Sequence, residues 1–376
     1  MASVVRHDRV RRWSLVAAVA AVLIALPAVV AAFPSPAAPV EPARLRQLIM
    51  ASAGQPHQGY AESTGRLGIP DLPNLEQVGS LLGGTTRIRS WYDSPDRWRF
   101  AVLSTLGNER DVYRAPDGEY AWEYGTNQFT QILGEAPVRL PRAGDLLPPD
   151  LARRVLTAAP GDPGSALPSR RVAGIAAAGL RIRPADPDTT IGQVDIWADP
   201  DTGLPVRVEV TARGAGQPVM VTEFLELSLT RPAPELIRPR APAGSGFTVL
   251  SVPDIAAAFN SEPTFFPGRL AGRELRTPEL AGIPGAALYG SDLAAFVVLP
   301  LPRGAGGRAT DAARRAAGSE LALPGGTGVL LSVPPVTAIV ARSTVSRRSF
   351  LIAGLVTPAV LERAAAELST ARRNRP

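Results

Sequence analysis

Residues 192–210 read GQVDIWADPDTGLPVRVEV and carry the clearest structural pattern of the chain. Between Val194 and Ala198, apolar residues alternate with Asp195 and Trp197, which is the two-residue period of a strand with one buried face. The letters DPDTG then predict a tight turn, and valines return at every second position up to Val210. The stretch is therefore predicted to form an antiparallel β-hairpin with one face in the core.

Similar strands and turns extend from this hairpin in both directions. The turn sequences DSPD at 93–96 and APDG at 115–118 each separate two strand-like runs. Short amphipathic runs predict helices at 43–52 and 150–158, the second with Asp150 as its cap. Consecutive hairpins with a few covering helices predict an α+β fold. The other predicted strands are 58–67, 85–92, 97–103, 110–114, 120–124, 129–133, 170–175, 180–183 and 220–229.

A proline-rich segment divides the chain. Residues 232–242 read PAPELIRPRAP, which predicts a stiff linker. We therefore predict a larger domain at 43–231, a linker at 232–243, a smaller α+β domain at 244–370 and a basic tail at 371–376. In the second domain, residues 304–326 are rich in glycine, alanine and arginine and are predicted to form a loop. Four arginines in or beside it are candidates for contact with an acidic partner surface: Arg303, Arg308, Arg314 and Arg315.

The N-terminal residues predict export. Four arginines between Arg6 and Arg12 precede an uncharged apolar run from Ser14 to Ala32. This order is typical of a secretory signal, and the closing VAA offers a cleavage site before Phe33. The run is also long enough to span a bilayer with the arginines in the cytoplasm. Residues 1–32 are therefore predicted to be a signal peptide or a transmembrane anchor, 33–42 a Pro/Ala linker, and the rest of the chain extracytoplasmic.

The composition excludes several kinds of site. The 376 residues include no cysteine and no lysine, and His57 is the only histidine after residue 32. Disulfides, cysteine-based metal sites, a lipobox cysteine and lysine Schiff bases are thereby excluded, and a Ser-His-Asp site is hard to assemble. The net charge of +6 comes from the two ends of the chain, so no nucleic-acid partner is expected. We also expect no cofactor. No metal site is expected either, because the calcium-loop-like DPDTG turn lacks the glutamate that closes an EF-hand and is interrupted by Pro205.

Several motifs together resemble a known superfamily. They are WADPDTGLP at 197–205, SWY at 90–92 with PDRWR at 95–99, GEYAW at 118–122 and RSFLIAG at 348–354. The chain resembles the LolA-like and RseB (MucB)-like superfamily of lipoprotein carriers and sigma-factor regulators over about residues 43–230. The C-terminal region resembles RseB-like proteins more loosely. The resemblance implies a curved, unclosed antiparallel sheet (a half-barrel) wrapped over helices, with an apolar concavity between them, followed by a smaller α+β domain.

Aromatic positions in the predicted strands are the candidate ligand-binding residues. An aromatic strand face is more often ordinary core, and that alternative stays open for each of them. His57 has no visible partner in the sequence and is expected to be structural or solvent-exposed. No spacing of carboxylates singles out a catalytic pair. The candidates are Trp91, Trp98, Phe100, Tyr120, Trp122, Tyr124 and Trp197.

The resemblance implies a non-catalytic extracytoplasmic protein that binds a lipid-like ligand or the acyl chain of a lipoprotein. Its additional C-terminal domain favours an RseB-like sensor or regulator, whose partner would be a membrane anti-sigma factor or another envelope protein. A LolA-like carrier of lipids or lipoproteins is the alternative within this class. Two other classes stay open at this point: an exported enzyme with a carboxylate-based site, and a purely structural or partner-binding envelope protein.

Overall fold

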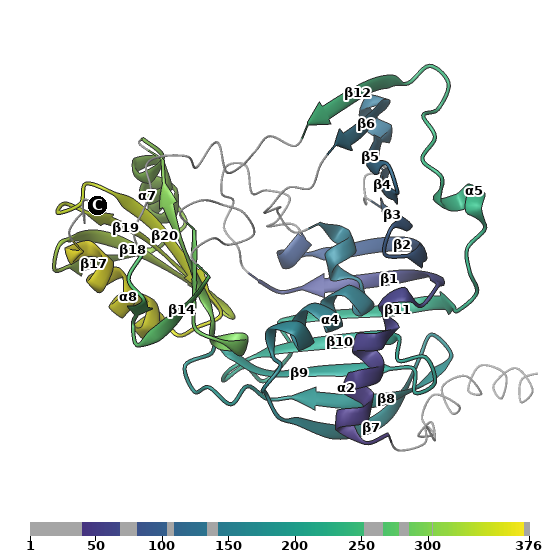
Figure 1. Cartoon of the computed structure of the whole chain (residues 1–376), viewed down its shortest axis with the longest axis horizontal. Coiled ribbons are helices and arrows are strands. Elements are labelled where there is room, and N and C mark those ends of the chain that lie inside the picture. Colours follow the sequence, from purple (N-terminus) through teal and green to yellow (C-terminus); the bar gives the residue numbers. More distant parts are fainter. Residues whose placement is uncertain are drawn as a thin grey trace, which may run out of the picture.

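The computed structural model describes residues 40–67, 81–103, 109–133, 142–251, 266–277, 286–302 and 304–371. They form two β-sheets, each with its own hydrophobic core and its own helices (Figure 1). The signal or anchor predicted at 1–32 lies outside these residues. Within them, no helix has both the length and the apolar character needed to cross a membrane.

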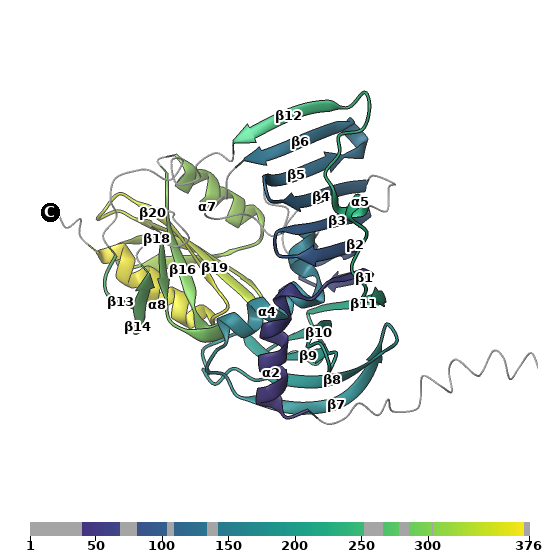
Figure 2. The ribbon, with the colours of Figure 1, turned by 45° about the vertical axis from the view of Figure 1, so that its right-hand side comes forward.

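The first sheet is open and strongly curved, as predicted (Figure 2). Its strand order is β12-β6-β5-β4-β3-β2-β1-β11-β10-β9-β8-β7, and every neighbouring pair is antiparallel except β12 with β6. The strands are β1 (His57–Gly65), β2 (Thr85–Ser94), β3 (Arg97–Leu103), β4 (Glu109–Ala115), β5 (Gly118–Glu123), β6 (Gln128–Leu133), β7 (Gly164–Val172), β8 (Ile175–Ile182), β9 (Ile191–Ala198), β10 (Pro205–Ala212), β11 (Met220–Ser228) and β12 (Gly246–Ser251).

The predicted hairpin is the pair β9 and β10. Val208 lies opposite Ile196 and Val210 opposite Val194, and all four side chains are buried in the same core. Between the strands, the backbone N–H of Gly203 donates to the carbonyl of Asp199 at 2.9 Å, which closes the turn. The predicted hairpin and its shared apolar face are therefore confirmed, although on β9 Asp195 and Trp197 of the other face are buried as well.

Two helices cover the concave face over one half of this sheet (Figure 1). α2 (Pro42–Ala51) buries Leu45 and Ile49, and α4 (Pro148–Ala158) lies against β10 and buries Ala152 and Leu156. The cap predicted at Asp150 is wrong, because the helix begins at Pro148, and proline suits a first helical turn that needs no N–H donor. Over the other half of the sheet the described helical elements are short: residues 81–83, and the 3₁₀ turns η1 (Ser52–Gly54) and η3 (Ala143–Leu146).

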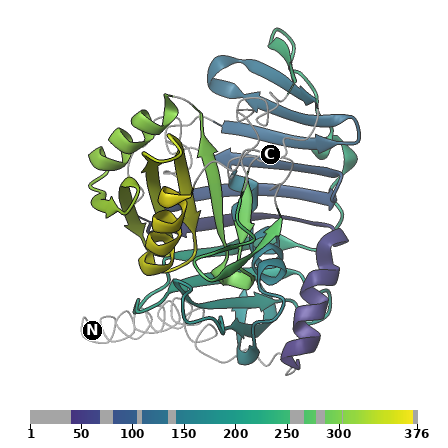
Figure 3. The same ribbon diagram turned by 60° about the vertical axis from the view of Figure 1, so that its left-hand side comes forward.

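The second sheet has eight strands in the order β13-β14-β15-β16-β20-β19-β18-β17. α8 (Pro358–Thr370) covers one face beside Ile339, and α7 (Ala305–Arg315) covers the other beside Val340 (Figure 3). The strands are β13 (Arg269–Leu270), β14 (Arg273–Thr277), β15 (Ala287–Tyr289), β16 (Phe296–Leu301), β17 (Ser319–Leu323), β18 (Gly326–Val333), β19 (Val336–Ser343) and β20 (Ser349–Gly354).

The loop prediction for 304–326 is wrong, because this stretch contains α7 and β17. Its small residues are what permit the close packing of α7, since Ala313 and Gly306 are buried against the sheet. A Cβ on Gly306 would lie 2.4 Å from the Cβ of Ser349, so a larger side chain could not approach as closely. Alanine has the highest helix propensity, which offsets the two glycines of the first turn.

The segment predicted to be a linker packs against the first sheet. α5 (Pro234–Ile237) lies against β2 and β3 on their convex side, and Arg231 pairs with Asp93 (Figure 1). Beyond it, the Asn127 side-chain amide donates to the carbonyl of Gly244 at 3.0 Å. β12 then pairs with β6, although it follows the predicted linker in sequence.

A loop of the first domain, residues 183–190, makes the main described contact with the second domain. The single hydroxyl proton of Thr189 is shared between the carbonyls of Leu293, at 2.6 Å, and Leu355, at 2.8 Å. Arg273 of β14 pairs with Asp186 and, at 2.9 Å, with Asp188. Hydrogen bonding to Arg273 lowers the pKa of Asp186, so the pair is ionised at neutral pH.

Candidate ligand-binding cavity

A cavity of about 680 Å³ lies on the concave side of β2–β6, between the sheet and residues of η3 and α4. Alternate side chains of neighbouring strands point into it, because residues two apart share a face of a strand. Phe100 lies opposite Val112, and Val112 opposite Ala121, so these three form a row across β3, β4 and β5. The apolar wall is formed by Leu81, Trp98, Phe100, Val102, Val112, Ala121 and Ile132.

An aromatic pair supports one part of this wall. The rings of Trp98 and Phe100 stack with 4.4 Å between their centroids, and the Trp98 indole N–H donates to the carbonyl of Pro95 at 3.1 Å. The turn η3 lies directly on Phe100, where a Cβ on Gly144 would come within 2.5 Å of the ring. Glycine at position 144 therefore allows the turn to close over the aromatic wall.

The side of the cavity facing η3 and α4 is ionic. Arg142 pairs with Glu119, Arg154 with Asp145 at 2.6 Å, and Arg153 with Asp150 at 3.3 Å. Burial raises the pKa of Asp150, an effect that the neighbouring Arg153 opposes. The cavity is therefore amphipathic, with a mainly apolar sheet wall, to which Arg110 and Glu119 also belong, and a side of paired charges at η3 and α4.

Tyr92 lines the cavity next to His57. The Tyr92 hydroxyl donates to the carbonyl of Ala53 at 2.6 Å, and burial raises its pKa to about 12. Its ring stacks on that of His57, which is buried as the first residue of β1. Burial lowers the pKa of His57 to about 4, so this histidine is neutral near pH 7 and has a structural role, one of the two expected from the sequence.

The predicted site residues divide between the two faces of the sheet. Trp98 and Phe100 line the cavity, whereas Trp91, Tyr120 and Trp122 lie on the opposite face. There Trp91 lies against the guanidinium of Arg99, 4.5 Å from ring centroid to Cζ. The Trp122 ring packs against Phe129, with 6.2 Å between their centroids.

The remaining two candidates lie away from the cavity. Tyr124 is in the 3₁₀ turn η2 (Tyr124–Thr126), and half of its surface is exposed. Trp197 is buried on β9, where its indole N–H donates to the carbonyl of Pro168 at 3.1 Å. The guanidinium of Arg170 lies over its ring.

Sequence reasoning missed the small aliphatic and charged residues of the cavity. Val102, Val112 and Ala121 follow the same two-residue period as Phe100 and could have been found from it. Arg142, Arg153 and Arg154 come from a turn and a helix, and no sequence period connects them with the strands. Within the described ranges, no three metal-ligating side chains come close enough together to hold a metal ion.

No family model and no curated protein matches the sequence. Among solved structures, the chain is similar to the MucA/MucB complex of Pseudomonas aeruginosa, with 17% identity, 85% of this chain and 95% of that chain covered, and a TM-score of 0.47. It is also similar to a LolA superfamily protein from Nitrosomonas europaea (11% identity, 52% and 97% covered, TM-score 0.25). A third is a putative outer membrane lipoprotein-sorting protein domain from Vibrio parahaemolyticus (10%, 49% and 90%, TM-score 0.22). The likeness concerns the fold, and these are the groups that the sequence motifs resemble.

Proposed function

We propose that this chain is a non-catalytic extracytoplasmic protein that binds a lipid-like ligand or a lipoprotein acyl chain in the cavity of its first domain. The observation that carries the proposal is the composition of the cavity walls. Its volume of about 680 Å³ is in the range of small-molecule sites, about 300–1,000 Å³. An acyl chain against Phe100, Val112 and Ala121 would gain roughly 0.8 kcal/mol per buried CH₂ group.

The paired charges opposite the apolar wall suit the polar end of such a ligand. Arg142, Arg153 and Arg154 each already pair with a carboxylate, so the wall is close to neutral without a ligand. A polar headgroup could exchange hydrogen bonds with these pairs while the chain lies on the sheet. The same pairing leaves none of Glu119, Asp145 and Asp150 as an unpaired carboxylate, which favours a binding role over a carboxylate-based enzyme.

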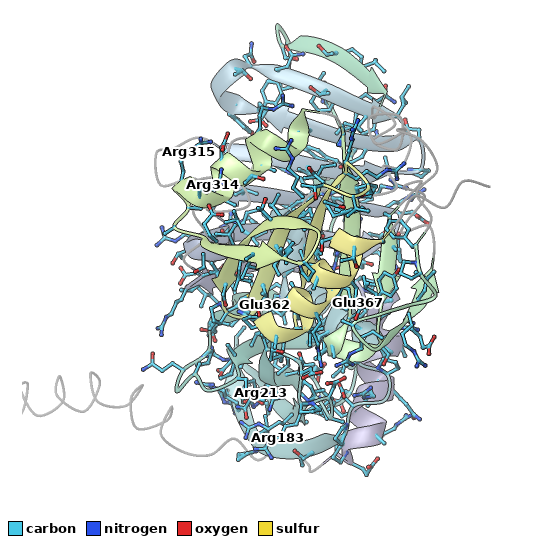
Figure 4. The ribbon with its side chains drawn as sticks, turned by 90° about the vertical axis from the view of Figure 1, so that its left-hand side faces the viewer. Arg183, Arg213, Arg314, Arg315, Glu362 and Glu367 are labelled. Atoms are coloured by element: carbon cyan, nitrogen blue, oxygen red, sulfur yellow. The ribbon has the colours of Figure 1, made fainter. Side chains whose placement is uncertain are left out.

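The second domain favours a regulator over a simple carrier. Its helix α7 carries Arg308, Arg314 and Arg315, and Figure 4 shows Arg314 and Arg315 at the C-terminal end of this helix. Arg314 pairs with Asp311 and Glu320 of the same domain. Arg303 lies outside the described residues. We infer that α7 contributes to docking on an acidic surface of a membrane partner, such as an anti-sigma factor.

Binding of a fluorescent fatty-acid analogue to the full chain, displaced by unlabelled lipid, tests the ligand proposal. Val112→Glu places a carboxylate in the apolar wall and is expected to weaken binding about tenfold or more, because a charge is costly in an apolar site. Trp91→Glu is the matched control, since Trp91 is also half-buried but faces the other side of the sheet. Equal loss in both variants, or no saturable binding by the folded wild type, would reject the proposal.

A further inference from the structure

The convex face of the first sheet carries an aromatic row that the cavity does not use. The Phe129 ring lies 5.7 Å from Tyr120 and 6.2 Å from Trp122, and the row continues to Phe247 of β12 at 6.1 Å, all between ring centroids. Phe129 is 2% exposed, whereas Phe247 is 56% exposed. The row is therefore buried within the sheet and open at its β12 end.

Other apolar side chains gather at the same end. Leu133 of β6, Val249 of β12 and Tyr124 of η2 are 42%, 48% and 50% exposed. Leu133 and Val249 share the face of Phe129 and Phe247 because they are an even number of residues away. Together with Phe247 they make up half of the exposed large hydrophobic side chains in the described part of the chain. Apolar groups clustered in this way mark an interaction site more often than scattered ones do.

β12 is also the one described sheet edge without a device against strand pairing. At the opposite end of the sheet, β7 carries a bulge between Leu167 and Arg170 and contains Pro168. In the second sheet, β13 has only two residues and β17 contains the charged Glu320. β12 reads GFTVLS, without charge or proline, and no described strand lies beyond it (Figure 2). Natural proteins protect edges of this kind unless the edge is used.

The backbone of β12 is oriented for a further strand. The N–H of Gly246 donates to the carbonyl of Asn127, so Gly246 directs its backbone groups toward β6. Because these groups alternate along a strand, Phe247 and Val249 direct theirs outward. The outward hydrogen-bonding groups therefore belong to the two residues whose side chains are exposed.

We propose that β12 pairs antiparallel with β12 of a second copy of this chain, forming a symmetric dimer with one continuous sheet. With the two-fold axis at Thr248, Phe247 of each copy lies opposite Val249 of the other, an aromatic–β-branched pair that covers both exposed side chains. Each such pair exchanges both of its outward N–H···O=C bonds. Because Gly246–Ser251 is uncharged, pairing with itself brings no like charges together.

The contact is small. Two six-residue strands bury less surface than the roughly 1,600 Å² of a standard stable interface. The dimer is therefore weak and depends on concentration, as at a membrane surface to which the chain is anchored or recruited. It is distinct from ligand binding in the cavity, because β12 lies beyond β6 at the edge of the sheet and contributes no residue to the cavity lining.

Cysteine cross-linking of the full chain, purified from expressing cells in a mild detergent, tests the dimer and its register. The chain has no cysteine, so one introduced thiol is the only one present. Thr248 would face Thr248 of the second copy in a non-hydrogen-bonded pair with Cα atoms about 4.5 Å apart, a spacing that a disulfide can bridge. Under mild oxidation, Thr248→Cys is expected to form covalent dimer at least about tenfold faster than Val345→Cys, an exposed control on the second domain.

A second variant separates pairing from chance collision. Val249→Pro removes an outward N–H and leaves the Gly246 bond to β6 intact, so it should slow the cross-linking of Thr248→Cys without unfolding the sheet. Phe247→Lys, which adds a protective edge charge, should do the same. The proposal is overturned if Thr248→Cys reacts no faster than Val345→Cys, if Val249→Cys reacts faster still, or if the thiol couples to a different protein of the cell instead of to its copy.

Discussion

His57 shows how one buried side chain makes the stability of the first domain depend on pH. Its Nδ1 lies 3.0 Å from the carbonyl of Gln55 and donates to it, which leaves Nε2 unprotonated in the neutral ring. Tyr92 stacks on one side of the ring, and Phe224 contacts it edge-on at 5.8 Å between centroids. A charge at this position would have no solvent and no carboxylate partner among the contacts described.

The pH dependence follows from the lowered pKa. The folded pKa of about 4 lies below the ordinary histidine value of 6.5, so between these two pH values the unfolded chain binds a proton that the folded chain does not. Above pH 6.5 the free energy of unfolding includes the full contribution of neutral His57. Between pH 6.5 and pH 4 this free energy falls by roughly 3 kcal/mol, and below pH 4 His57 causes no further change. His57→Phe keeps an aromatic ring on Tyr92 and should remove this slope. Urea unfolding of both proteins near neutral pH and at about pH 4.5 measures this loss of stability. The same loss in the wild type and in His57→Phe would contradict the role given to His57.

At the scale of elements, the turn of the β9–β10 hairpin positions helix α2. Gly203 has a φ of +73°, and a Cβ there would lie 2.3 Å from the carbonyl oxygen of Leu48 in α2. Asp199 holds the same turn, accepting from the Thr202 hydroxyl at 2.6 Å. The DPDTG sequence therefore sets both the hairpin and the distance at which the helix packs on it.

Gly203→Ala tests this contact. Substitution should lower the free energy of unfolding by about 2 kcal/mol or more, through strain at positive φ combined with the clash against Leu48. Gly214→Ala is the matched control, with a φ of +77° and no atom within 4 Å of its Cβ. It should cost only the backbone strain of about 1 kcal/mol. Equal losses for the two variants in thermal or urea unfolding would show that the turn does not support α2.

For the whole molecule, the sequence predicts the strands better than it predicts their partners. The period within β3 places Trp98 and Phe100 on one face, but pairing with β2 decides which other aromatic residue joins them. The register puts Trp98 opposite Tyr92 and Trp91 opposite Arg99, with an irregularity between Tyr92 and Ser94. A one-residue shift exchanges the two faces of a strand. The sequence does not reveal this shift, so it predicts Trp91 and Trp98 in one candidate site, although they lie on opposite faces.

The sequence also does not reveal which strand forms the edge of the sheet beside β6. β12 is distant in sequence from β6, and nothing in GFTVLS identifies a parallel partner across the linker. The loop 183–190 likewise has no period that would reveal its contacts with Arg273 and Leu355. Non-local contacts of this kind form only when distant segments fold together, so no local sequence pattern predicts them. Alternation within single strands is a local property, which is why the hairpin at 192–210 could be predicted.

The presence of a lipid-like ligand in the cavity is tested most directly by organic extraction of the purified full chain, followed by mass spectrometry of the extract. Ala121→Trp fills the apolar wall from inside the cavity and serves as the blocked protein, with its folding checked by circular dichroism. The wild type should release an amphiphile in an amount close to one per chain, and Ala121→Trp should release much less. A folded wild type that releases no lipid, or equal amounts from both proteins, would contradict a lipid-binding cavity.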